Sequence, residues 1–247
     1  MEQQLIVKNL PFIKILPSWA QELSYKYLSK TTNLYLLHGN IRDFLPHKMN
    51  EGEFTFVKIQ DYISEVLFGN RDIIAFWDRS SGVSFCTSDM HKAYLKAMRD
   101  RYPDADDEML FSADPEIAFR MLERYFLLNI PNKKRIVLIV DYAETILPAG
   151  ETAKLDDADR YCFVTLNRWS HDPVFTKGDV SVILLSENLS ELNPRVVASP
   201  ASIKVEIPIP SEEVRTSFLE FLEAKGTLLL DKGLNCHAVG AITSGLN

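Results

Sequence analysis

The chain has 247 residues, of which 46% are hydrophobic and 25% charged, which is typical of a globular protein with room for one large α/β domain and a smaller appendage. The net charge of −7 argues against a general nucleic-acid binder, whose affinity comes from basic groups that neutralise phosphates. No apolar run approaches the ~18 residues of a membrane span, and the polar N-terminus shows no secretory signal. The three cysteines are far apart without metal-ligand spacing, so we expect reduced thiols in a cytoplasmic protein.

Short apolar runs alternate with helical patterns along the chain. Helices are expected over about 19–28, 56–68, 90–101, 114–129, 157–170 and 212–225, and residues 79–85 are expected to form a loop. Alternating strands and helices predict an α/β fold, here a five-stranded parallel sheet sandwiched by helices. The expected strands are Leu34–Leu37, Ile73–Trp77, Ile136–Val140, Val180–Leu185 and Ile203–Ile207.

The central strand is predicted by the run Ile136–Val140, in which four of five residues are β-branched. A run with no polar face suits a strand that is buried on both sides of a parallel sheet. Asp141 follows it directly and would lie at the carboxyl edge of the sheet, where open α/β folds bind ligands. A carboxylate there can hold a Mg²⁺ that bridges nucleotide phosphates, or it can simply cap the loop that follows.

The segment after the first strand lacks most of a phosphate-binding loop. The motif G-x-x-x-x-G-K-[ST] supplies backbone N–H groups, a lysine and a hydroxyl to phosphates and Mg²⁺. This chain has G-N-I-R-D-F-L-P over residues 39–46, without the second glycine, the lysine or the hydroxyl. Asp43 would also add negative charge beside a phosphate. The candidate nucleotide-binding residues that remain are Gly39, Asn40 and Arg42, so binding of ATP and Mg²⁺ is expected to be weak or lost.

From about Asp114 onward the sequence resembles an AAA+ ATPase domain, and the resemblance extends roughly over residues 34–247. Asp141 falls on the Walker B aspartate, and Asn188 on the polar sensor-1 position. Residues 188–215, N-L-S-E-L-N-P-R-V-V-A-S-P-A-S-I-K-V-E-I-P-I-P-S-E-E-V-R, resemble the family's passage from sensor 1 into the helical lid. The resemblance implies a P-loop NTPase-like fold with an N-terminal arm and helix at 1–33, an α/β domain at 34–210 and a partial lid at 211–247.

The departures from the family pattern all remove catalytic chemistry. The Walker A lysine position is Leu45 or lost, and the residue after Asp141 is Tyr142 instead of a glutamate that could polarise water. The two arginine-finger positions are Ser199 and Ser202, which cannot neutralise a developing phosphate charge.

We therefore expect a non-hydrolysing AAA+-like module of an ATP-driven remodelling protein, which serves assembly or engages a partner or substrate. The expected partners are other AAA+ subunits of an oligomer or a downstream AAA+ domain, together with a protein substrate or adaptor. An active domain beyond Asn247 would make the full-length protein an ATPase. No membrane or nucleic-acid partner is expected.

Two alternatives remain open. In a divergent but active ATPase, Asp141 would bind Mg²⁺, Asn188 would orient water, Glu144 would act as the base and Arg42 would replace the missing lysine. In an unrelated α/β binding domain, Asp141 and Asn188 would be structural only. Phe85 would either grip a substrate, as the aromatic pore-loop residue of an AAA+ ring does, or simply pack within the domain. We favour packing.

Overall fold

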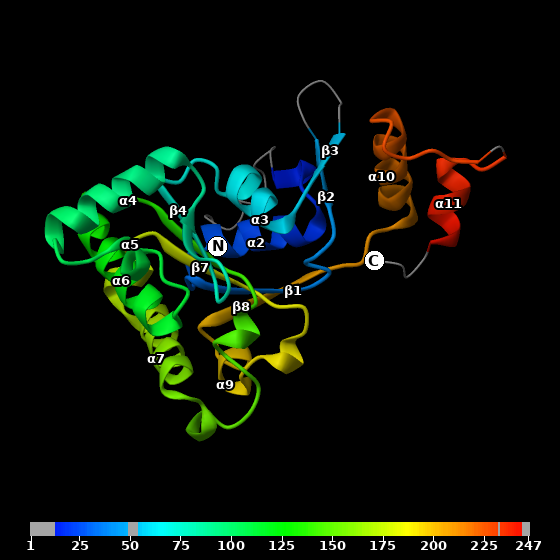
Figure 1. Cartoon of the computed structure of the whole chain (residues 1–247). Coiled ribbons are helices and arrows are strands. Elements are labelled where there is room, and N and C mark those ends of the chain that lie inside the picture. Colours follow the sequence, from blue (N-terminus) through cyan, green and yellow to red (C-terminus); the bar gives the residue numbers. More distant parts are fainter. Residues whose placement is uncertain (1–12, 49–53, 232, 244–247) are drawn as a thin grey trace.

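The computed structural model describes residues 13–48, 54–231 and 233–243 (Figure 1). Most of the expected N-terminal arm and the last four residues lie outside these ranges. The described chain forms a six-stranded sheet in the order β5-β4-β6-β7-β1-β8. The strands are β1 (Leu34–Gly39), β4 (Ile73–Asp78), β5 (Gly82–Phe85), β6 (Ile136–Val140), β7 (Val180–Leu185) and β8 (Ser202–Ile207).

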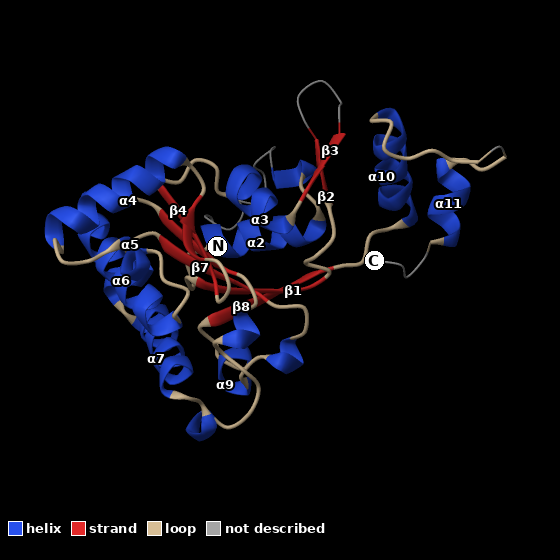
Figure 2. Ribbon diagram, viewed as in Figure 1, coloured by secondary structure: helices blue, strands red, loops and turns tan. Residues whose placement is uncertain are grey.

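The five predicted strands all lie parallel in this one sheet, as expected. Helices cover both faces (Figure 2). The central strand β6 explains the arrangement, because Ile136, Leu138 and Val140 join one core while Val137 and Ile139 join the other. All five are completely buried, which is why the run has no polar position.

The helices divide between the two faces according to the core that their apolar residues enter. The core containing Val137 is covered by α2 (Ser18–Leu28) and by α3 (Ile59–Asp61), which continues as a π-helical turn over Tyr62–Leu67. The core containing Leu138 is covered by α4 (Ser88–Arg101), α5 (Asp107–Leu110), α6 (Pro115–Asn129), α7 (Asp157–His171), α8 (Pro173–Lys177) and α9 (Pro194–Val197). Among the described residues, no helix has the length and apolar composition needed to cross a bilayer.

Two sequence-based predictions about secondary structure are wrong. The helix expected from Phe56 begins only at Ile59, because Phe54–Val57 forms β3 and pairs with β2 (Leu45–Lys48) in an antiparallel hairpin. The segment expected to be a loop contains β5, which begins at Gly82 after a turn over residues 79–81 and pairs antiparallel with β4. Short apolar segments fit a strand or a helix equally well, so tertiary pairing decides between them. The Phe85 ring lies 4.8 Å from that of Tyr94, which confirms its packing role.

The two helices after the sheet are α10 (Glu212–Ala224) and α11 (Cys236–Ile242), and they pack on each other beyond the β2–β3 hairpin (Figure 1). The hairpin contacts α10 through aromatic rings: the Phe56 centroid lies 5.0 Å from that of Phe218 and 5.3 Å from that of Phe221. The hairpin therefore follows the segment compared with a phosphate loop, and it contacts the expected lid helix through apolar rings.

Asp72 ties the amino ends of β4 and β6 together and gives a pH-dependent contribution to stability. Its carboxylate accepts hydrogen bonds from the backbone N and the Nε of Arg135 at 2.9 and 3.2 Å, and the backbone bond is the main reason that its pKa is lowered to about 2. A lowered carboxylate pKa stabilises the fold above the unfolded-state pKa, near 3.9, and this stabilisation is lost as the pH falls through about 2.

We expect the Asp72→Asn variant to lose about 1 kcal/mol or less in the free energy of unfolding, because the carboxylate is partly exposed. Urea unfolding should show this difference in full at pH 7 and a much smaller one at pH 2; a difference of the same size at both pH values would contradict it.

Candidate functional site

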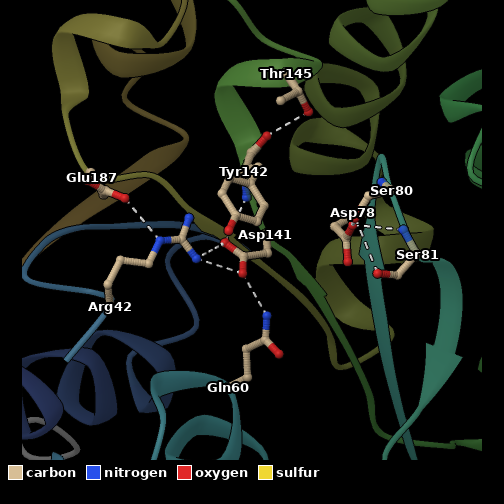
Figure 3. Close-up of polar contacts among 9 residues, drawn as sticks. All are labelled: Arg42, Gln60, Asp78, Ser80, Ser81, Asp141, Tyr142, Thr145 and Glu187. Atoms are coloured by element: carbon tan, nitrogen blue, oxygen red, sulfur yellow. Dashed lines mark hydrogen bonds and ion pairs between the residues drawn. The ribbon is translucent and has the colours of Figure 1, made fainter. Parts of the chain in front are cut away.

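Three polar side chains from separate parts of the chain meet at the carboxyl edge of the sheet (Figure 3). Asp141 follows β6, Arg42 lies in the loop after β1, and Glu187 follows β7. Because β1, β7 and β6 are adjacent parallel strands, their carboxyl ends bring these residues to one place. Asp141 is only 7% exposed, so its charge needs a partner.

Arg42 supplies that partner. Its Nη1 lies 2.9 Å from both carboxylate oxygens of Asp141, and its Nε lies 3.0 Å from Oε1 of Glu187. The guanidinium also lies over the ring of Tyr142, 4.0 Å from the centroid. Partial burial lowers the pKa of Arg42, but the hydrogen bonds to Asp141 and Glu187 outweigh this and leave it raised. Arg42 is therefore held as a cation between two acids.

Two further N–H donors complete the surroundings of Asp141. Gln60 Nε2 donates to Oδ2 at 2.8 Å, and the backbone N of Tyr142 donates to Oδ1 at 2.8 Å. Tyr142 adopts a left-handed backbone with φ of 51° and is 45% exposed, so its ring lies over the guanidinium at the surface (Figure 3). The carboxylate of Asp141 thus accepts four hydrogen bonds and is fully paired within the chain.

The loop after β1 uses its backbone N–H groups internally. The N of Gly39 donates to Glu187 O, and the N of Asn40 donates to Ile207 O, both at 2.9 Å, while the N of Ile41 donates to Gly39 O at 2.8 Å. The side chain of Asn40 donates to Asp43 Oδ2 at 2.6 Å. In a phosphate-binding loop such N–H groups point at the ligand and lead into a helix N-terminus. Here they are satisfied, and the chain continues into β2.

These residues do not fit a magnesium nucleotide. Mg²⁺ needs oxygen ligands in a near-octahedral arrangement, whereas both oxygens of Asp141 accept N–H donors and Arg42 already supplies the positive charge.

The remaining predicted site residues lie outside this network. Asn188 is exposed, and its Nδ2 donates to Glu191 Oε1 at 3.0 Å. Glu144 lies in the short 3₁₀ helix Ala143–Thr145, and its Oε2 is buried without a hydrogen-bond partner among the described residues. The structure therefore brings Asp141 and Arg42 together, places Gly39 and Asn40 in the adjoining loop, and leaves Asn188 apart.

The sequence analysis missed Gln60 and Glu187 as members of the network. Glu187 could have been found, because it follows a predicted strand at the same edge and immediately precedes Asn188. Gln60 gave no comparable signal, since its position depends on where the β2–β3 hairpin ends and α3 begins.

Comparisons with known proteins agree with this architecture. Residues 10–208 match the family model described as AAA+ chaperone, N-terminal Rossmann-like domain. A search of curated proteins found no match. Among solved structures, a chain from "Structure of E. coli MS115-1 HORMA:CdnC:Trip13 complex" is similar over 100% of this chain and 72% of that chain, with 16% identity and a TM-score of 0.51. At that identity the similarity is one of fold. Because the family model spans most of the sequence, the chain belongs to the family of N-terminal Rossmann-like domains of AAA+ chaperones.

Proposed function

We propose that this domain is a non-hydrolysing module of an ATP-driven remodelling protein, in which the Arg42–Asp141 ion pair replaces the magnesium nucleotide. The contacts of 2.9 Å from Nη1 of Arg42 to both oxygens of the buried Asp141 carboxylate carry this proposal. A cation supplied by the chain itself satisfies the acid permanently. The fold then keeps its shape without a ligand, because the core strands and the site residues are different positions.

The missing chemistry supports the same proposal. Phosphoryl transfer needs a metal ion, a cation on the phosphates and a group that orients the attacking water. Tyr142 holds its ring against Arg42, and Asn188 donates to Glu191, so both side chains already have partners within the chain. An active version of this site, with Glu144 as the base, would require Arg42 to leave Asp141 first.

The proposed role is structural and binding. The domain would assemble with other AAA+ subunits or with a downstream AAA+ domain in a cytoplasmic oligomer, and it would engage a protein substrate or adaptor. The description of the matched family as the N-terminal domain of a chaperone supports this role. The similar solved structure comes from a complex whose title names a HORMA protein, CdnC and Trip13, which favours a protein partner for this fold.

Calorimetric titration with ATP and ADP in the presence of Mg²⁺ tests the proposal. We expect no saturable heat with the wild-type chain at millimolar nucleotide, because no described group replaces the lysine and the acid is already paired. Asp141→Ala should behave identically.

The matched control is Asp78→Ala. Asp78 ends the neighbouring strand β4 at the same edge, but its carboxylate accepts hydrogen bonds from Ser80 and Ser81 instead of Arg42 (Figure 3). Saturable binding that survives Asp78→Ala and is lost in Asp141→Ala would overturn the proposal and identify a working nucleotide site.

A further inference from the structure

The two edge strands of the six-stranded sheet differ in how the rest of the chain covers them. β5 forms one edge, and the residue after α5 covers it, because the backbone N of Val83 donates to Phe111 O at 3.3 Å. β8 forms the other edge and pairs with β1 alone among the described strands. An open strand edge presents unpaired N–H and C=O groups to which another strand can bond.

Lys204 and Glu206 direct their backbone groups to the open side of β8. Alternate residues of a strand bond to the same neighbour, and the N of Asn40 in the loop after β1 donates to Ile207 O at 2.9 Å. Ile207 and Val205 therefore bond to β1, whereas Lys204 and Glu206 face away from it. In the described ranges, no hydrogen bond from elsewhere in the chain reaches the backbone N or O of these two residues.

The neighbouring outward-facing positions limit the free donors to these two. The N of Ser202 already donates to Ser199 O at 3.2 Å, and Pro208 has no N–H. In an antiparallel contact between two β8 edges, one register uses both remaining donors, with Lys204 opposite Glu206 of the second copy. Shifting the register by two residues would place Lys204 opposite itself or Glu206 opposite itself.

The side-chain charges favour the same register. Both side chains are exposed and point to one face of the sheet, since they are two positions apart. Neither has an ion-pair partner in the part of the chain that the structure describes. Nζ of Lys204 donates to Val197 O at 2.8 Å, which holds the ammonium group beside the edge with further N–H donors to spare. Opposite charges directly across an antiparallel pair stabilise it, and like charges destabilise it.

We propose that two copies of this chain associate through their β8 edges, antiparallel and with Val205 opposite Val205, into one continuous sheet. Each pair of Lys204 and Glu206 exchanges both backbone hydrogen bonds, as directly opposite residues do in a hydrogen-bonded antiparallel pair. The contact uses none of Arg42, Asp141 and Glu187, so it holds whether or not the domain binds nucleotide.

A competing explanation is that the edge is protected from pairing. Charged side chains and proline on an edge strand discourage contacts with other chains, and Lys204, Glu206 and Pro208 fit that description. Protection requires only that charges are present, so it predicts a monomer at every concentration. Self-association requires a lysine and a glutamate that are opposite each other across the contact.

Charge reversal combined with sedimentation equilibrium, from micromolar to millimolar protein, separates the two explanations. We expect the wild-type chain to show a reversible monomer–dimer equilibrium. Lys204→Glu and Glu206→Lys each place like charges opposite one another in both pairs, so the association constant should fall about tenfold or more. The double variant Lys204→Glu/Glu206→Lys, and an equimolar mixture of the two single variants, should recover the wild-type association.

The matched control is Lys96→Glu, which changes the net charge equally at an exposed position of α4 and should associate like the wild type. Amide hydrogen exchange provides a readout of the backbone contact. The amides of Lys204 and Glu206 should exchange more slowly as the concentration rises, whereas that of Val205 should be protected throughout, because it is bonded to β1. Protection of Val205 in each variant also shows that the sheet is folded.

Three results would overturn the proposal. The first is a wild-type chain that stays monomeric up to millimolar concentration. The second is association that both single reversals leave unchanged, which would assign the contact to another surface. The third is failure of both the double variant and the mixture to recover association while the sheet remains folded.

Discussion

The Arg42→Ala variant is expected to be less stable than the wild type by about 2–4 kcal/mol in the free energy of unfolding. The substitution leaves the buried carboxylate of Asp141 without its cation, and only Gln60 and the backbone N of Tyr142 remain as donors. The Arg42 side chain is 34% exposed, so the loss should fall below that of a completely buried pair. Urea unfolding at pH 7 measures the difference.

A double-mutant cycle with Asp141→Asn separates the ion pair from simple loss of packing. The neutral amide does not require a cation, so Arg42→Ala should cost about 1–3 kcal/mol less in the Asp141→Asn background than in the wild type. If the losses of unfolding free energy from Arg42→Ala and Asp141→Asn simply add in the double mutant, Arg42 does not neutralise Asp141. The main argument for a nucleotide-independent site would then fail.

The Gly39→Ala variant is also expected to lose about 2–4 kcal/mol, although no ligand is involved. Gly39 has φ of +91°, where a side chain is strained, and an added Cβ would lie 2.6 Å from Ile207 O. That carbonyl oxygen accepts the N–H of Asn40, so it cannot move without breaking a bond between the loop and β8. The structure thus gives a structural reason for a glycine that the sequence suggested for nucleotide binding.

Gly150→Ala is the matched control for this variant. Gly150 also has a positive φ, +127°, but its added Cβ would have no heavy atom within 4 Å. The Gly150→Ala variant should therefore lose only about 1–2 kcal/mol in the free energy of unfolding, from backbone strain alone. If the two variants unfold at the same urea concentration, the contact with Ile207 is relieved without cost and the explanation for Gly39 is wrong.

The sequence located Asp141 correctly at the carboxyl edge of the sheet, but it did not identify Arg42 as the partner of Asp141. The run before Asp141 is long and apolar enough to fix β6 as a central strand, and the position of Asp141 at the carboxyl edge follows directly. Arg42 was predicted as a nucleotide contact, whereas the structure pairs it with Asp141, 99 positions away. A contact over that separation depends on the order of the strands, which no local pattern encodes.

Local signals also located several elements accurately. A helix was expected over 114–129, and in the structure the helix begins at Pro115 while Oδ1 of Asp114 accepts the N–H of Ile117 at 3.0 Å. This signal is reliable because a capping side chain acts within three residues of its own position. The hairpin at β2 and β3 was missed because its pairing joins residues on two separate strands, Leu45–Lys48 and Phe54–Val57, and because Phe56 packs on α10.

The sequence by itself determined the fold class, the central strand and the loss of the phosphate-loop residues, since these depend on runs of neighbouring residues and on which side chains are present. Only the tertiary structure decided that Asp141 is paired with Arg42 and that Glu187 and not Asn188 joins them. The physical reason is that a parallel sheet brings together the ends of strands from distant parts of the chain. The chemistry at those ends depends on which strands are neighbours.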